Sequence, residues 1–165
     1  MTHRPFVAAV AVLALAPATA AARPSDFPED HSFIVNAAHA NHAEIAAAKL
    51  ALNKSDDPGI RAYARRMITD HTKAQAQLKK LGAAWSTKVP SGPSAAQKRE
   101  AAALKSLSGA SFERTYLKRQ VVDHREALGV MLVEASGGKV AGLRSFAAAT
   151  APVVRMHLQM AQALR

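Results

Sequence analysis

The chain has 165 residues, of which 49% are hydrophobic and none is cysteine, and its formal net charge is +10. This length suits one domain, and the lack of cysteine excludes a fold held by disulfides, so a hydrophobic core must stabilise the protein. The positive charge favours anionic lipid, an acidic envelope polymer or a protein as partner. Nucleic acid is not expected, because the basic residues do not alternate with aromatic ones.

Residues 1–22 have the pattern of an export signal. Arg4 precedes an unbroken apolar run from Phe6 to Ala16, and small residues then offer cleavage after Ala20 or Ala22. The run is shorter than the roughly 20 apolar residues that span a bilayer, and retention as an amphipathic anchor is the alternative to cleavage. We therefore expect a periplasmic or envelope protein with one domain over residues 23–165; its oligomeric state is not predicted.

The first helix is predicted to begin at Pro28, because proline is tolerated in a first turn and the acidic residues Glu29 and Asp30 suit the helix dipole. Its apolar stripe is rich in alanine, so we expect a neighbouring helix to approach it closely. A single glutamate, Glu44, interrupts this stripe. The stripe consists of Phe33, Ala37, Ala40, Glu44, Ala48 and Ala51.

A second helix is predicted to start after Asp57, which can cap it, with Pro58 at its first position. Its apolar face carries His71, and the pattern fades at Gly82. The segment 86–94 contains two prolines and a glycine and predicts a crossover between two halves of the chain. A short helix over residues 95–107 should follow.

The third long helix is predicted to begin at a cap formed by Ser111 and to end at Gly137, and its apolar stripe contains His124. The fourth begins near Val140 and contains His157. Pro152 lies inside this last pattern and should kink the helix one turn before His157, because it removes a backbone donor.

Four long helical patterns and no alternating strand pattern predict an all-α protein, an antiparallel four-helix bundle. It would consist of two helical hairpins, one before and one after a crossover that contains a short helix. The hairpin geometry brings Glu44 and His71 to similar heights, and His124 and His157 approximately so.

Each long helix thus offers one metal-competent side chain on its apolar stripe: Glu44, His71, His124 and His157. A carboxylate and three imidazoles in a bundle core could bind iron, manganese, zinc or copper. Asp70 and Asp123 each precede a histidine and are rotated about 100° from it, so they could be ligands or could hold an imidazole in place. The alternative is structural, with the histidines hydrogen-bonded across the bundle.

Other chemistries have less support. The bundle motif for two metals places a glutamate three residues before each histidine, but Ile68 and Val121 occupy these positions, which disfavours a dinuclear iron oxidase. Met67, Met156 and Met160 leave a Cu(I) site open, although core packing also explains them. The chain has no Gly-x-Ser-x-Gly motif and no glycine-rich phosphate loop, so we assign no catalytic residue.

The segment Ala64–Ala74, with the sequence ARRMITDHTKA, and the segments Ala43–Ile45, Phe112–Tyr116, Asp123-His124 and His157–Ala161 resemble a known family. It consists of exported bacterial proteins with a ferritin-like domain of unknown function, often described as outer-membrane proteins. The resemblance covers nearly all of the chain after the signal. It implies a ferritin-like four-helix bundle in the periplasm or envelope and carries over no activity.

Three interpretations follow. The preferred one is a non-catalytic envelope bundle with a polar Glu/His core, whose basic surface binds a partner. The alternative is a ferritin-like protein that binds a transition metal. The third is a sensor whose buried histidines respond to pH.

Overall fold

The structure is a computed structural model that describes residues 27–165. Its five helices are α1 (Pro28–Lys54), α2 (Pro58–Ala84), α3 (Ala95–Lys105), α4 (Gly109–Gly137) and α5 (Ala141–Ala163). No strand occurs between residues 27 and 165, so the all-α prediction is confirmed. The export signal predicted for residues 1–22 lies outside the described residues.

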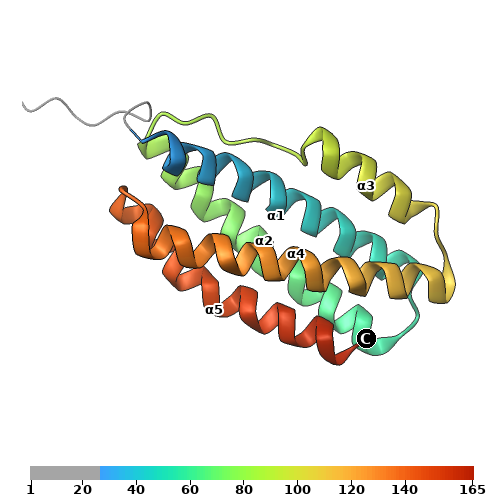
Figure 1. Ribbon diagram of the computed structural model, residues 1–165. Helices are drawn as coiled ribbons and strands as arrows, with labels where there is room; N and C mark the ends of the chain where they lie inside the picture. Colours follow the sequence, from blue (N-terminus) through green and yellow to red (C-terminus); the bar gives the residue numbers. More distant parts are fainter. Residues whose placement is uncertain (1–26) are drawn as a thin grey trace, which may run out of the picture.

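The four long helices lie side by side, and α3 lies outside them (Figure 1). Helices α1 and α2 form one hairpin and α4 and α5 the other, and these are the two most extensive helix pairings. The hairpins meet where α2 packs against α5 and where α1 packs, less extensively, against α4. The predicted crossover places α3 against both α1 and α4, so this short helix covers the seam between the two hairpins.

Capping residues explain several helix boundaries. The predicted cap at Asp57 is confirmed, because its Oδ1 accepts a hydrogen bond of 2.8 Å from the N–H of Ile60. The prediction that Ser111 caps the third long helix is wrong, because α4 begins at Gly109. Gly109 has a φ of +51°, a conformation that glycine adopts without steric cost, and this lets the helix start three residues earlier than predicted.

Pro152 does not end α5, which continues from Ala141 to Ala163. The proline side chain is exposed, so its ring occupies solvent rather than the core. Two residues before the proline, the Thr150 hydroxyl donates to the carbonyl of Phe146 at 2.7 Å. The helix therefore brings His157 into the interior despite the missing backbone donor.

The apolar core has two parts, one on each side of a polar layer. One part contains Tyr63, Met67 and Tyr116, and the other contains Leu78, Met131 and Phe146. On each helix the metal-competent residue falls between the residues that enter these two parts; on α2, for example, His71 lies between Met67 and Leu78. The polar layer is consequently closed above and below by hydrophobic packing.

A buried carboxylate ties the two hairpins together at one end of the molecule. Asp30 on α1 is 3% exposed and accepts hydrogen bonds from the backbone N–H groups of Lys139 and Val140, at 2.9 and 2.5 Å from Oδ2. These groups stand at the start of α5, where backbone donors have no partner within the helix. Asp30 thus satisfies the start of α5 in addition to lying in the first turn of its own helix.

The basic residues of α2 lie mainly on its outer face. Arg65, Arg66, Lys73, Lys79 and Lys80 are exposed, as the sequence pattern predicts. Among residues 27–165, no helix is both long and apolar enough to cross a membrane.

Candidate metal centre

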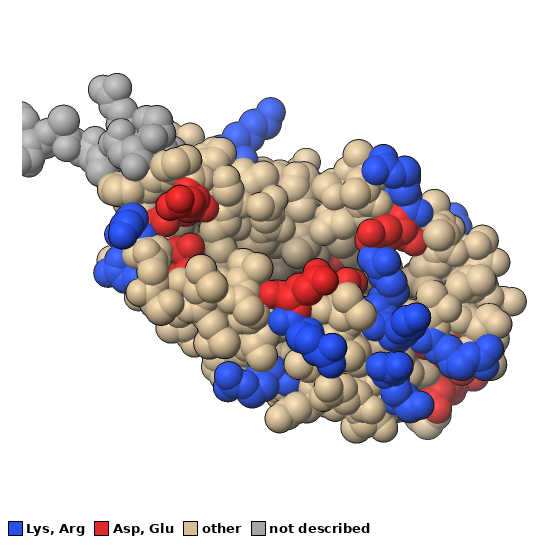
Figure 2. All heavy atoms as spheres, in the orientation of Figure 1, with Lys and Arg blue, Asp and Glu red and all other residues tan. Residues whose placement is uncertain are grey.

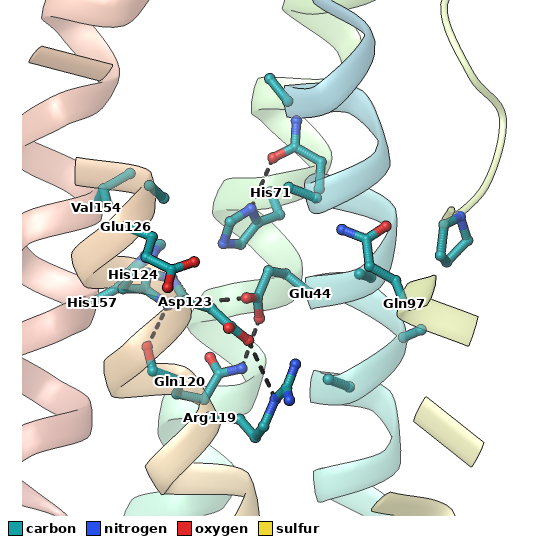
Figure 3. A pocket seen from close by; sticks show the side chains of 18 of the residues that line it. Glu44, His71, Gln97, Arg119, Gln120, Asp123, His124, Glu126, Val154 and His157 are labelled. Atoms are coloured by element: carbon teal, nitrogen blue, oxygen red, sulfur yellow. Dashed lines mark hydrogen bonds and ion pairs between the residues drawn. The ribbon is translucent and has the colours of Figure 1, made fainter. Parts of the chain in front are cut away.

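Three histidines from three helices converge in the polar layer. His71 on α2, His124 on α4 and His157 on α5 offer ring nitrogens that all lie within 4.8 Å of one another (Figure 3). His124 is 2% and His157 is 1% exposed, and His71 is half-buried. The structure therefore brings together three of the six residues that the sequence suggested as ligands.

One nitrogen of each ring is held by an oxygen that can only accept. His71 Nδ1 lies 2.9 Å from Asn41 Oδ1, and His124 Nδ1 lies 2.9 Å from the backbone carbonyl of Gln120. His157 Nε2 lies 2.9 Å from Asp70 Oδ2. Since an acceptor needs a donor, each of these nitrogens carries the proton of its neutral ring.

The oxygen of Asn41 is directed at His71 by a chain of amides. Gln75 Nε2 donates to the backbone carbonyl of Pro90 at 3.4 Å, which turns Gln75 Oε1 toward α1. That oxygen accepts from Asn41 Nδ2 at 3.3 Å, so Asn41 Oδ1 remains for His71. Gln75 Nε2 also lies 3.1 Å from Nε2 of His42, so His42 and a carbonyl in the crossover segment together orient the amides that hold His71.

The other three ring nitrogens have no hydrogen-bond partner. They are His71 Nε2, His124 Nε2 and His157 Nδ1, and all three are buried. With the tautomers above, each of them carries a lone pair, and the centroids of the three rings lie 5.4–5.8 Å apart. Lone pairs cannot hydrogen-bond to one another, and a cation between them is one group that would pair with all three.

A proton is a poor choice for that cation. Burial, assisted by the charges of His124 and His157, lowers the pKa of His71 to about 3. Burial also lowers the pKa of His157, although its hydrogen bond to Asp70 opposes the shift. The rings of His71 and His157 are therefore neutral near pH 7, which is the form that binds metal ions.

Glu44 belongs to the polar layer but not to the three-nitrogen group. It is 8% exposed, and its Oε2 accepts from Gln120 Nε2 at 2.7 Å. Its Oε1 lies 4.0 Å from Nδ1 of His124, the nitrogen that already donates to a carbonyl. Gln120 Oε1 in turn accepts from the Tyr63 hydroxyl at 2.8 Å, so Glu44 is positioned by an extended network.

Asp70 and Asp123 differ in what they contact. Burial alone would raise the pKa of Asp70, but hydrogen bonds from Arg66 and His157 outweigh it and lower the pKa below its ordinary value. Asp123 lies 3.8 Å from Arg119, and its side chain is 37% exposed. Burial, assisted by the charge of Glu44, raises the pKa of Asp123 to about 6. Asp123 makes no hydrogen bond to the three histidines.

The sequence interpretation missed three amide side chains that position the site: Asn41, Gln75 and Gln120. A signal for them exists, because each lies one helical turn from a residue already singled out. Asn41 precedes Glu44 by three residues, Gln75 follows His71 by four, and Gln120 precedes His124 by four. Buried amides one turn from a buried histidine are candidates for holding it.

These features define the class of the protein as an all-helical domain with a buried three-histidine cluster. The chain belongs to the family described as a domain of unknown function (DUF4142), which matches residues 14–164. The matched range begins inside the predicted signal.

Among solved structures the chain is similar to a crystal structure of a DUF305 fragment from Deinococcus radiodurans. The TM-score is 0.73 and the sequence identity 16%, and the match covers 83% of this chain and 95% of that chain. Identity this low supports the likeness of the folds and nothing further. No curated protein matches the chain.

Proposed function

We propose that this protein binds one transition-metal ion through His71 Nε2, His124 Nε2 and His157 Nδ1. The observation that carries the proposal is a cluster of three adjoining histidine rings, each with one buried, unpaired nitrogen and with its other nitrogen donating to a fixed acceptor. Histidines that bind metals usually donate their second N–H to a carboxylate, a carbonyl or water, and this contact sets both tautomer and orientation.

The donor set favours zinc or copper(II). Three neutral imidazoles suit zinc, copper, iron and nickel, whereas manganese prefers oxygen donors. In a tetrahedral site with metal–nitrogen distances of about 2.0–2.1 Å, the nitrogens would lie roughly 3.4 Å apart. The three nitrogens are already within 4.8 Å of one another, so small side-chain rotations suffice. Met67, Met156 and Met160 do not line the cavity beside the histidines, which gives a thioether-bound Cu(I) less support.

The structural alternative accounts less well for the geometry. Histidines that only stabilise a core would have both nitrogens paired, because each buried, unpaired polar atom costs about 1–3 kcal/mol. Here three such atoms lie on rings whose centroids are 5.4–5.8 Å apart. A bound cation offsets all three at once.

We also propose the finer classification and location that the sequence suggests. Two helical hairpins joined by a crossover are the arrangement of a ferritin-like four-helix bundle. The signal pattern of residues 1–22 and the absence of cysteine fit an exported protein of the periplasm or envelope. Its exposed basic face would bind anionic lipid or an acidic polymer.

Metal content is the direct test. The full chain, expressed with its own signal and purified without chelators or an added histidine tag, is analysed for bound metals. It is then titrated calorimetrically with zinc, copper(II), iron(II) and manganese(II). We expect one zinc or copper(II) ion per chain and a melting temperature that rises with that ion.

A matched pair of variants identifies the ligands. His124→Ala removes one of the three donors and should weaken binding at least about 100-fold, while His31→Ala removes an exposed histidine of α1 and should change nothing. Circular dichroism of both metal-free variants verifies folding, and His71→Ala provides a second test if His124→Ala does not fold. Unchanged affinity in folded variants, or no bound ion in the parent, would contradict the proposal.

A further inference from the structure

A cavity of about 660 Å³ lies directly beside the three histidines. It runs between α1 and α4, extends to α5 and is covered on the outside by α3, whose Gln97 and Leu104 line it. The surface is hollowed between α1 and α4, with acidic side chains beside the hollow (Figure 2). Its volume lies in the range of roughly 300–1,000 Å³ that is usual for small-molecule sites.

The body of the cavity is apolar. Its walls include Ala40, Ala43, Leu104, Val130, Phe146 and Val154. Val130 is 51% exposed, which gives the cavity an apolar residue in contact with solvent. The small alanine side chains of α1 leave the space open where larger residues would close it.

Polar residues line the cavity at the level of the three histidines. All three histidines and Glu44 line it, and so does Tyr116, whose buried hydroxyl has no hydrogen-bond partner. A three-histidine metal site has one coordination position that the protein does not fill, and sites of this composition bind water or substrate there. The cavity is therefore placed to supply that fourth ligand.

The charges around the cavity restrict which ligand fits. Five carboxylates line it (Glu44, Asp70, Glu100, Asp123 and Glu126), against one guanidinium, that of Arg119. Arg119 forms ion pairs with Glu100 and Asp123, so it is not available to an anion. Even a divalent ion leaves an excess of negative charge, which disfavours an anionic ligand.

We propose that the cavity binds a neutral, mainly hydrocarbon small molecule whose one donor nitrogen or hydroxyl oxygen completes the coordination of the metal. The inference rests on the proposed metal site, because without an ion the donor group has no partner. It adds to the metal proposal the class of ligand and the direction in which the ligand binds. The donor atom points toward the histidine layer, and the hydrocarbon part packs against the apolar walls of the cavity.

The test uses the full chain loaded with cobalt(II), whose visible spectrum reports a change of coordination. The loaded protein is titrated with 1-methyl-, 1-butyl- and 1-hexylimidazole, and with hexanoate as an anion of similar size. Each added methylene should tighten binding about fourfold while the cavity is filling. Hexanoate should bind more weakly than 1-butylimidazole.

Two matched variants separate the cavity from the rest of the surface. Ala43→Leu fills part of the cavity and should remove most of the dependence on chain length while leaving cobalt affinity unchanged. Ala148→Leu makes the same substitution at an exposed position of α5 outside the cavity and should behave like the parent.

The possible failures are distinguishable. If cobalt does not bind, the metal proposal fails before any ligand is added, and this inference fails with it. If cobalt binds but alkylimidazoles of different length bind equally, or hexanoate binds as tightly, the metal site stands and the cavity proposal is overturned. An undiminished chain-length dependence in Ala43→Leu overturns it as well.

Discussion

The two Asp-His pairs of the chain look equivalent in sequence and differ in the structure. Asp70 reaches across to His157 on α5, while Asp123 pairs with Arg119 at the edge of the cavity. Neither aspartate holds the histidine that follows it, because adjacent residues on a helix point about 100° apart. Asn41 and the carbonyl of Gln120 hold His71 and His124 instead. A repeated dipeptide therefore does not imply a repeated role: Asp70 and His71 contact other helices, whereas Asp123 and His124 contact residues one turn earlier on α4.

The largest difference between the pairs should follow from removing Asp70. Asp70→Ala leaves His157 Nε2 buried without its acceptor, so we expect a 10- to 100-fold loss of zinc affinity, to be measured by calorimetry. Urea unfolding of the metal-free protein should also show a loss of about 1–3 kcal/mol. An affinity equal to that of the parent would mean that His157 does not need this contact.

Removing Asn41 tests the corresponding support of His71. Asn41→Ala frees Nδ1 of this half-buried ring, and because water can replace part of the lost contact, we expect about a tenfold loss of zinc affinity. Gln120→Ala is the comparison, since it keeps the backbone carbonyl that holds His124. It should weaken zinc binding less than Asn41→Ala, and the reverse order would contradict the assigned contacts.

Acid should destabilise the metal-free protein through protonation of His71 in the unfolded state. The unfolded chain takes up a proton at His71 below about pH 6.5, whereas the folded protein does so only near pH 3. The unfolded state thus binds more protons in this window, and the free energy of unfolding falls as the pH drops below about 6.5. Between pH 7 and 5.5, His71→Gln should lose roughly 1 kcal/mol less than the parent in urea unfolding. Equal losses in both proteins would show that His71 is not kept neutral by the fold.

Removing the charge of Asp123 should have the smallest effect. Asp123→Asn changes a carboxyl that is 37% exposed and bonded to none of the three histidines. Because the fold raises the pKa of this carboxyl, its charge does not stabilise the folded state, and we expect stability to stay the same or to rise by less than about 1 kcal/mol. Zinc affinity should change less than twofold. A loss comparable to that of Asp70→Ala would restore Asp123 as part of the centre.

Much of the fold was predictable because its signals are local. Pro28, Asp57 and Gly137 mark helix ends through their own backbone properties, and one polar residue in each apolar stripe indicated the layer in which the histidines meet. The start of α4 was not predicted correctly, since the positive φ of Gly109 depends on how the crossover approaches the helix.

The contacts of the site were harder to predict because they depend on helix rotation and on distant segments. No local pattern pairs Asp70 with a histidine 87 residues later. The alanine stripe of α1 predicted close packing along its whole length, but this is correct for only one half. Ala48 and Ala51 are buried in close packing, whereas Ala37 and Ala40 line the cavity. Small side chains permit close approach without enforcing it.

The hydrogen bond from Gln75 to the carbonyl of Pro90 has a consequence for protein design. To transfer this centre to another protein, a designer must transfer more than the three histidines. The ring of His71 is oriented by two amides and by a carbonyl outside the long helices. A graft of the histidines alone onto another helical scaffold would leave His71 free to choose the other tautomer.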